Sequence, residues 1–176
     1  MKNWKTALGL ALISLLAGFR PAAATEYYVG ALVERNDLKI EPNYLTGIEM
    51  DRMPEGMATG ADVVHLEVDV HAAKGEKHGF AENEWIPYLT VGYTIEKIGT
   101  SFKKSGHLYA MTAGDGPHYA NNVALDGAGR YHLTYSFESP SMQGFIRHVD
   151  KATGVPNWWK PFSVSWTFAY PGKPKE

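Results

Sequence analysis

The sequence is 176 residues long, carries a formal net charge of −2 and contains no cysteine. Without a thiol no disulfide can support the fold and no thiolate can bind a metal ion, which excludes a blue-copper centre. The slightly acidic balance, with no basic cluster, argues against partners such as nucleic acid and anionic membrane surfaces.

The first 24 residues have the pattern of a secretory signal peptide. Lys2 and Lys5 precede an apolar run, and the alanines at 22–24 offer a cleavage site. The run is shorter than the roughly 20 residues that a membrane-spanning helix needs. We therefore expect cleavage on export to the periplasm, with no direct membrane anchor. Removing residues 1–24 takes away three positive charges and no acid, so the net charge of 25–176 becomes −5.

The remaining sequence predicts an all-β fold. Segments rich in β-branched and aromatic residues alternate with turns rich in Gly, Pro, Asp, Asn and Ser, and no helical period exceeds about two turns. Short strands at this density predict a single domain, an immunoglobulin-like antiparallel β-sandwich. The expected strands, in chain order, are 26–33, 37–40, 43–49, 62–72, 85–97, 107–113, 121–125, 130–138 and 161–170.

Three of these strands carry alternating apolar rows that we expect to fill the sandwich. The rows are Leu89, Val91, Tyr93 and Ile95; Tyr131, Leu133, Tyr135 and Phe137; and Phe162, Val164, Trp166 and Phe168.

The segment VVHLEVDVH, residues 63–71, places four ionisable side chains on one strand face: His65, Glu67, Asp69 and His71. At about 3.3 Å per residue, His65 and His71 lie roughly 20 Å apart and cannot share one metal ion. His65 and Glu67, about 6.6 Å apart along the backbone, can do so. The row is therefore either a solvated face or one part of a metal site.

A second candidate is MTAGDGPH, residues 111–118, where a strand end is followed by a Gly-Pro turn. Such a turn can bring the Met111 thioether and the His118 imidazole to a common centre, with Asp115 between them. The alternative is that Met111 fills a gap in the core.

Two further candidates are weaker when taken alone. His148 follows FIR near a strand end and by itself looks like a surface histidine. The segment EMDRMPEGM, residues 49–57, holds three methionines and three acids, including Glu49 and Met50. Thioether together with imidazole selects copper over magnesium or calcium. A flexible loop resting on an apolar patch is the other explanation.

No nucleophile elbow, phosphate-binding glycine loop or HExxH motif is present, which argues against ordinary hydrolase or NTPase chemistry. Besides a metal-binding protein, two alternatives remain open. One is an adhesion or carbohydrate-binding module that presents Trp158 and Trp159 as an exposed aromatic platform. The other is a copper-dependent oxidase or reductase that acts on a metal such as iron.

The motifs YYVGALV, YLTGIEMDRM, DVVHLEVDVHA, WIPYLTV, GDGPHYANNV and NWWKPFSVSWTFAY together resemble the FetP-like periplasmic high-affinity iron-transport protein family. The resemblance covers essentially all of residues 25–176. It implies an immunoglobulin-like homodimer that binds copper and serves iron uptake beside an inner-membrane iron permease.

The resemblance also implies which residues bind the metal. The implied copper ligands are His65, Glu67, Met111, His118 and His148. Met50, its neighbour Glu49 and Asp115 correspond to further positions near the copper or near a second site for iron. Because each histidine must be neutral to coordinate, we expect metal affinity to fall as the pH drops through about 6.5.

Overall fold

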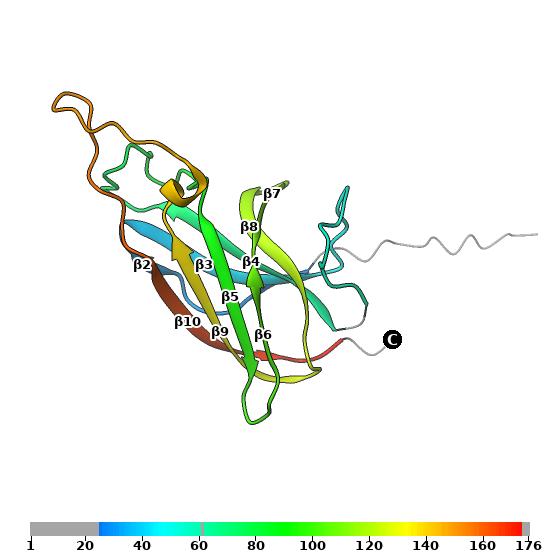
Figure 1. The fold of residues 1–176 in the computed structure, drawn as a ribbon. Coiled ribbons are helices and arrows are strands. Elements are labelled where there is room, and N and C mark those ends of the chain that lie inside the picture. The colour runs from blue at the N-terminus through cyan, green and yellow to red at the C-terminus, as the bar shows by residue number, and fades with distance from the viewer. Residues whose placement is uncertain (1–24, 61, 174–176) are drawn as a thin grey trace, which may run out of the picture.

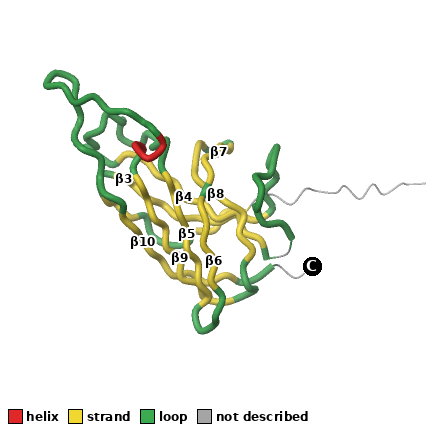
Figure 2. The backbone as a smooth tube through the Cα atoms, in the orientation of Figure 1, coloured by secondary structure: helices red, strands yellow, loops and turns green. Residues whose placement is uncertain are grey.

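The computed structural model describes residues 25–60 and 62–173. The expected signal peptide, residues 1–24, lies outside this range. The strands, shown in Figures 1 and 2, are β1 (Thr25–Tyr28), β2 (Val33–Arg35), β3 (Leu38–Thr46), β4 (Val63–Ala72), β5 (Thr90–Lys97), β6 (Lys103–His107), β7 (Tyr109–Ala113), β8 (Gly116–Ala124), β9 (Gly129–Glu138) and β10 (Phe162–Tyr170). A short 3₁₀ helix, η1 (Pro140–Gln143), follows β9.

The strands form two sheets in which every pair is antiparallel. One sheet has the order β1-β3-β4-β8-β7, with β2 also paired to β3, and the other has the order β10-β9-β5-β6. Figure 1 shows the four-stranded sheet lying in front of the six-stranded one. The predicted all-β antiparallel sandwich is confirmed. Among the described residues, no helix is long and apolar enough to cross a membrane.

The predicted core rows do lie between the sheets. The residues of these rows are buried, apart from Tyr93 and Val164, which are partly buried and pack against the core. Tyr135 is fully buried and its hydroxyl donates a hydrogen bond of 3.0 Å to the backbone carbonyl of Glu67. This bond ties the two sheets together directly beneath the ionisable row of β4.

Two predicted strands, 37–40 and 43–49, are in fact the single strand β3, although Pro42 lies inside it. The Pro42 carbonyl accepts a hydrogen bond from the Val29 N–H on the β1–β2 side of β3. The backbone nitrogen of a strand residue faces the same side as its carbonyl, so the N–H that proline lacks would also point to this side. On that side β1 pairing stops at Asn43 and β2 pairing begins at Ile40. The proline therefore falls in a gap of the ladder and removes no hydrogen bond.

Other strand boundaries also differ from the prediction. The strand expected from 85 begins only at Thr90, because Tyr88 has φ of 60° and cannot continue an extended chain. The strand β6 was expected to be a turn, yet it pairs along β5. The strand expected at 121–125 is the longer β8, which begins directly after the turn at Gly114 and Asp115.

Candidate metal centre

Two histidines and a glutamate meet on the outer face of the six-stranded sheet. His65 and Glu67 come from β4, whose residues of the opposite parity, from Val64 to Val70, point to the core, and His118 comes from β8. Glu67 pairs with Ala120 across these strands, so His118, two residues earlier in β8, lies diagonal to it on the same face. One ligand atom from each residue lies within 4.8 Å of the others.

The carboxylate of Glu67 lies between the two imidazoles. Its Oε2 atom is 3.4 Å from Nε2 of His118 and 3.8 Å from Nε2 of His65. The exposed fractions are 4% for His65, 6% for Glu67 and 5% for His118. A carboxylate so far removed from water needs either a proton or a cation beside it.

Asn122 fixes the orientation of His65. Its Oδ1 atom is 2.8 Å from His65 Nδ1, and an amide oxygen only accepts, so Nδ1 carries the hydrogen. Nε2 is left with a free lone pair directed towards Glu67, which is the form that binds metals. Asn122 could not be identified from the sequence, because only its pairing with His65 across β4 and β8 reveals this contact.

The environment keeps these three side chains uncharged at neutral pH. Burial raises the pKa of Glu67 to about 8, and the nearby carboxylates of Asp69 and Asp115 add to this. Burial also lowers the pKa values of His65 and His118 from the ordinary value of a histidine. Both imidazoles are therefore free to coordinate, while Glu67 holds a proton that a cation would displace.

Further carboxylates surround the group on the same face. Burial raises the pKa of Asp69 to about 6, with additional contributions from Glu41, Asp115 and Glu26. Asn43 donates to Asp69 Oδ2 at 3.4 Å. These acids come from β1, β3, β4 and the turn before β8, and together they make this face strongly attractive to cations.

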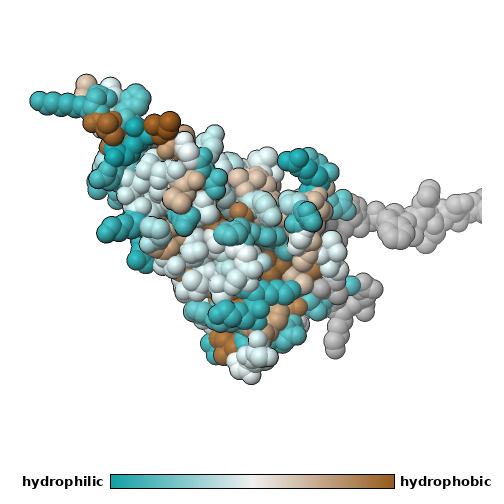
Figure 3. All heavy atoms as spheres, viewed as in Figure 1, coloured by the Kyte–Doolittle hydropathy of each residue, from teal (hydrophilic) through white to brown (hydrophobic). Residues whose placement is uncertain are grey.

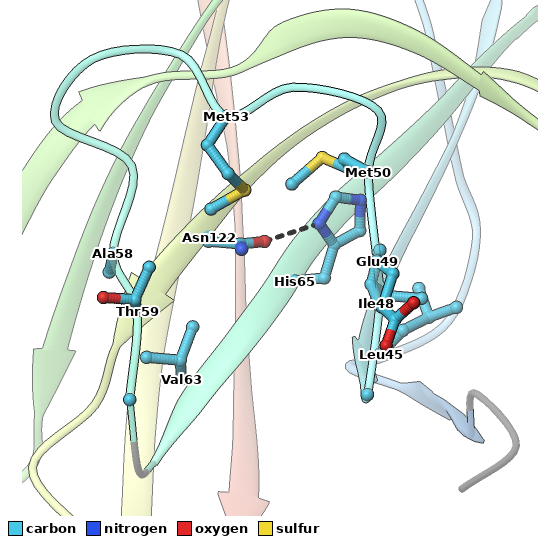
Figure 4. Close-up of a pocket in the computed structure, with 12 residues that line it drawn as sticks. Leu45, Ile48, Glu49, Met50, Met53, Ala58, Thr59, Val63, His65 and Asn122 are labelled. Carbon is cyan, nitrogen blue, oxygen red and sulfur yellow. Dashed lines mark hydrogen bonds between the residues drawn. The ribbon is translucent and has the colours of Figure 1, made fainter. Parts of the chain in front are cut away.

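The methionines singled out in the sequence also lie at this site. Met111 pairs with His118 across the hairpin of β7 and β8. Met50 and Glu49, on the loop after β3, line a pocket of about 520 Å³ together with His65. In Figure 4 the Met50 side chain lies against the His65 ring.

His148 does not join the group within one chain. It lies on the long loop between η1 and β10, where its side chain is 74% exposed and its Nδ1 atom is 2.8 Å from Thr153 Oγ1. In Figure 1 this orange loop projects on the side of the view opposite the cyan loop that carries Met50.

Trp158 and Trp159 are not an exposed platform, so this premise of the carbohydrate-binding alternative is wrong. Trp158 stacks on His78 with ring centroids 4.6 Å apart, and Trp159 packs against the core. Both rings are half-buried. They attach the long loop to the sandwich instead of presenting a flat aromatic surface.

Comparison with known proteins points to one family. The family model described as Fe2+ transport protein matches residues 23–172. A UPF0423 protein of Brucella abortus is 41% identical over an alignment of 182 residues that covers 100% of this chain and 98% of that protein. The 34 kDa membrane antigen of Treponema pallidum is 29% identical over 150 residues, covering 82% of this chain and 74% of the antigen.

Solved structures agree with this result. FetP of uropathogenic Escherichia coli is 45% identical, with a TM-score of 0.78 and coverage of 89% of this chain and 100% of FetP. The copper-reconstituted P19 protein of Campylobacter jejuni is 41% identical, with a TM-score of 0.80 and coverage of 86% and 99%. The resemblance noted from the sequence is confirmed, and this chain belongs to the Fe2+ transport protein family.

Proposed function

We propose that this protein is a periplasmic, copper-binding component of an iron-uptake system. The observation that carries the proposal is the buried group of His65, Glu67 and His118, which presents two free imidazole nitrogens and a displaceable proton. Similarity to proteins that were solved with copper, together with membership of an iron-transport family, supports the same conclusion.

The side chains present fit copper well. His65, Glu67 and His118 would hold the ion, with the thioethers of Met111 and Met50 beside them. Imidazole and thioether suit Cu(I), and a carboxylate favours the harder Cu(II), so copper bound here can adopt both oxidation states. The protein's own contribution is to orient His65 through Asn122 and to release the Glu67 proton on binding.

Iron would bind on the acidic part of the same face. Carboxylate oxygens are hard ligands that suit iron ions, and Asp69, Glu41, Glu26 and Asp115 interact electrostatically around the group. We propose that Asp115, on the turn just before His118, belongs to this iron site. From there iron would be passed to an inner-membrane permease.

We further propose that the protein is a homodimer in which His148 completes the site of the other chain. His148 lies between two strongly exposed apolar residues, Ile146 at 88% and Val149 at 75%. Brown atoms on the projecting loop in Figure 3 show this apolar character. Apolar side chains exposed to this extent on one loop are well suited to contact with another chain.

Sedimentation of the double variant Ile146→Ser, Val149→Ser tests the dimer. The wild-type protein is expected to sediment as a dimer at micromolar concentration, and the double variant as a folded monomer. The single variant His148→Ala should remain dimeric but bind metal more weakly. A monomeric wild-type protein would contradict the dimer proposal without affecting the proposal for the group of His65, Glu67 and His118.

Metal loading of residues 25–176 tests the function itself. After complete removal of metal, the protein should take up about one Cu(II) per chain in equilibrium dialysis, because the described part of the chain, residues 25–60 and 62–173, contains one His–Glu–His group. The matched variant Asp115→Asn should keep this copper and lose affinity for iron. Failure of the demetallated protein to bind copper on reloading would disprove the proposal.

A further inference from the structure

Met53 lies on the loop between β3 and β4 and, unlike Met57 on the same loop, is not buried in the core. Met57 on this loop is 8% exposed and belongs to the buried hydrophobic residues, whereas Met53 is 43% exposed. Burial therefore does not hold Met53 in place, and what distinguishes it from the more exposed Met142 is its position in a pocket beside Met50 and His65.

The Met53 side chain is directed into the pocket that also holds Met50 and His65. Figure 4 shows the two thioethers on the same side of the pocket, with the His65 ring and its partner Asn122 below them. The same three residues, Met50, Met53 and His65, line this pocket of about 520 Å³. This pocket is open to solvent and reaches the His–Glu–His group at His65, on the side where His65 contacts Asn122.

Met50 links this pocket to a second one. The adjoining pocket is lined by Met50 together with Met111, which pairs with His118. The sulfur-bearing side chains thus form a series from the solvent-exposed Met53, through Met50, to Met111 at the metal group.

The backbone holds the loop in place over the pocket. Met57 N–H donates to the Pro54 carbonyl at 3.2 Å, and Ala58 N–H donates to the Asn122 carbonyl at 3.2 Å. The loop is therefore fastened to the residue that orients His65. A thioether held at the mouth of a pocket loses less conformational freedom when it binds a ligand.

We propose that Met53 and Met50 form a capture site for monovalent copper, at which Met53 takes the ion from a weak complex in solution and Met50 passes it to the group of His65, Glu67 and His118. Thioethers are soft, neutral ligands that bind Cu(I) and discriminate against hard divalent ions. Each step is a ligand exchange in which copper remains monovalent, so no oxidant or reductant is required. The inference rests on the proposed copper function and adds the route and oxidation state of loading.

Methyl NMR of protein labelled at the methionine methyl groups detects the site directly, with Ag(I) as a redox-inert substitute for Cu(I). Ag(I) added beyond the one equivalent that the group of His65, Glu67 and His118 takes up should shift the Met53 and Met50 methyl signals. The signals of Met57, which is buried, and of Met142, which is 63% exposed on η1, should stay unchanged. Equal shifts at Met53 and Met142 would show non-specific thioether binding and overturn the proposal.

Loading kinetics provide the second readout. Met53→Leu keeps the size and apolarity of the side chain but removes the sulfur, and we expect it to slow transfer from the Cu(I)–bicinchoninate complex by about fivefold or more. Met142→Leu is the matched exposed control and should load at the wild-type rate. Final copper stoichiometry and the rate of Cu(II) loading should be the same in all three proteins. Wild-type Cu(I) kinetics in Met53→Leu would overturn the proposal.

The double variant His65→Ala, His118→Ala separates this inference from the proposed function. Ag(I) should still shift the Met53 and Met50 methyl signals in that variant, although copper is no longer retained at the centre. Retained copper at the centre with no Met53 response would refute only the capture site. A Met53 response in a wild-type protein that does not hold copper at the centre would refute the proposed function instead.

Discussion

Replacing His118 with alanine is expected to lower the affinity for Cu(II) by about a hundredfold or more. We expect a loss of this size because replacing even a residue that only orients a metal ligand lowers metal affinity by about 10–100-fold. His118 offers a ligand atom itself. His118 Nε2 is 3.4 Å from the Glu67 carboxylate, so removing the imidazole opens one side of the group. Competition titration against a chelator of known affinity measures the change.

Two further variants make this result interpretable. His107→Ala removes an exposed histidine at the end of β6, outside the group, and should bind copper as the wild-type protein does. Met111→Leu conserves volume and should weaken Cu(I) binding more than Cu(II) binding, because it removes only a soft ligand. Wild-type affinity in a folded His118→Ala protein would remove the basis of the proposed site.

The metal-free protein is expected to lose about 2 kcal/mol of stability between pH 6.5 and pH 8.5. The folded state raises the pKa of Glu67 to about 8 from its ordinary value of 4.5, because the side chain is buried near other carboxylates. In this window the folded state therefore binds more protons than the unfolded state, and its stability falls as the pH rises through about 8. The lowered pKa values of His65, His71 and His118 act in the opposite sense, mainly below about pH 7, so they offset the loss only at the acid end of this window.

Urea denaturation at several pH values measures this dependence. Glu67→Gln keeps the shape of the protonated side chain without a titrating group, so its stability should be almost flat from pH 6.5 to 8.5. A wild-type curve as flat as that of the variant would contradict the assignment of the proton to Glu67.

The same proton changes the expected pH dependence of metal binding. The sequence led us to expect competition from histidine protonation below about 6.5. The structure lowers the pKa values of His65 and His118 and raises that of Glu67 to about 8. Proton competition therefore begins near pH 8, and Glu67 is the residue responsible for it.

The alternating pattern of β4 allowed its prediction to within one residue, because VVHLEVDVH has an unambiguous two-residue period. The buried aromatic rows of β9 and β10 were predicted for the same reason. The strands with weaker patterns, β6 and the start of β8, became clear only from their pairing with β5 and β7. Local sequence does not encode such long-range register.

The same limit applies to the site. His65, Glu67, Met111 and His118 could be named from local chemistry and resemblance, but their mutual distances depend on the pairing of β4, β8 and β7. Asn122, Glu26 and Glu41 were missed because nothing near them in the sequence marks them as neighbours of β4. The position of His148 in a second chain remains a proposal.

Anomalous diffraction at the copper absorption edge, from crystals of the copper-reloaded protein, would locate the bound copper relative to His65, Glu67 and His118. We expect one strong peak per chain, bounded by Nε2 of His65, Nε2 of His118 and the Glu67 carboxylate. A fully loaded crystal with no peak at this position, or with its copper bound to other histidines, would contradict it.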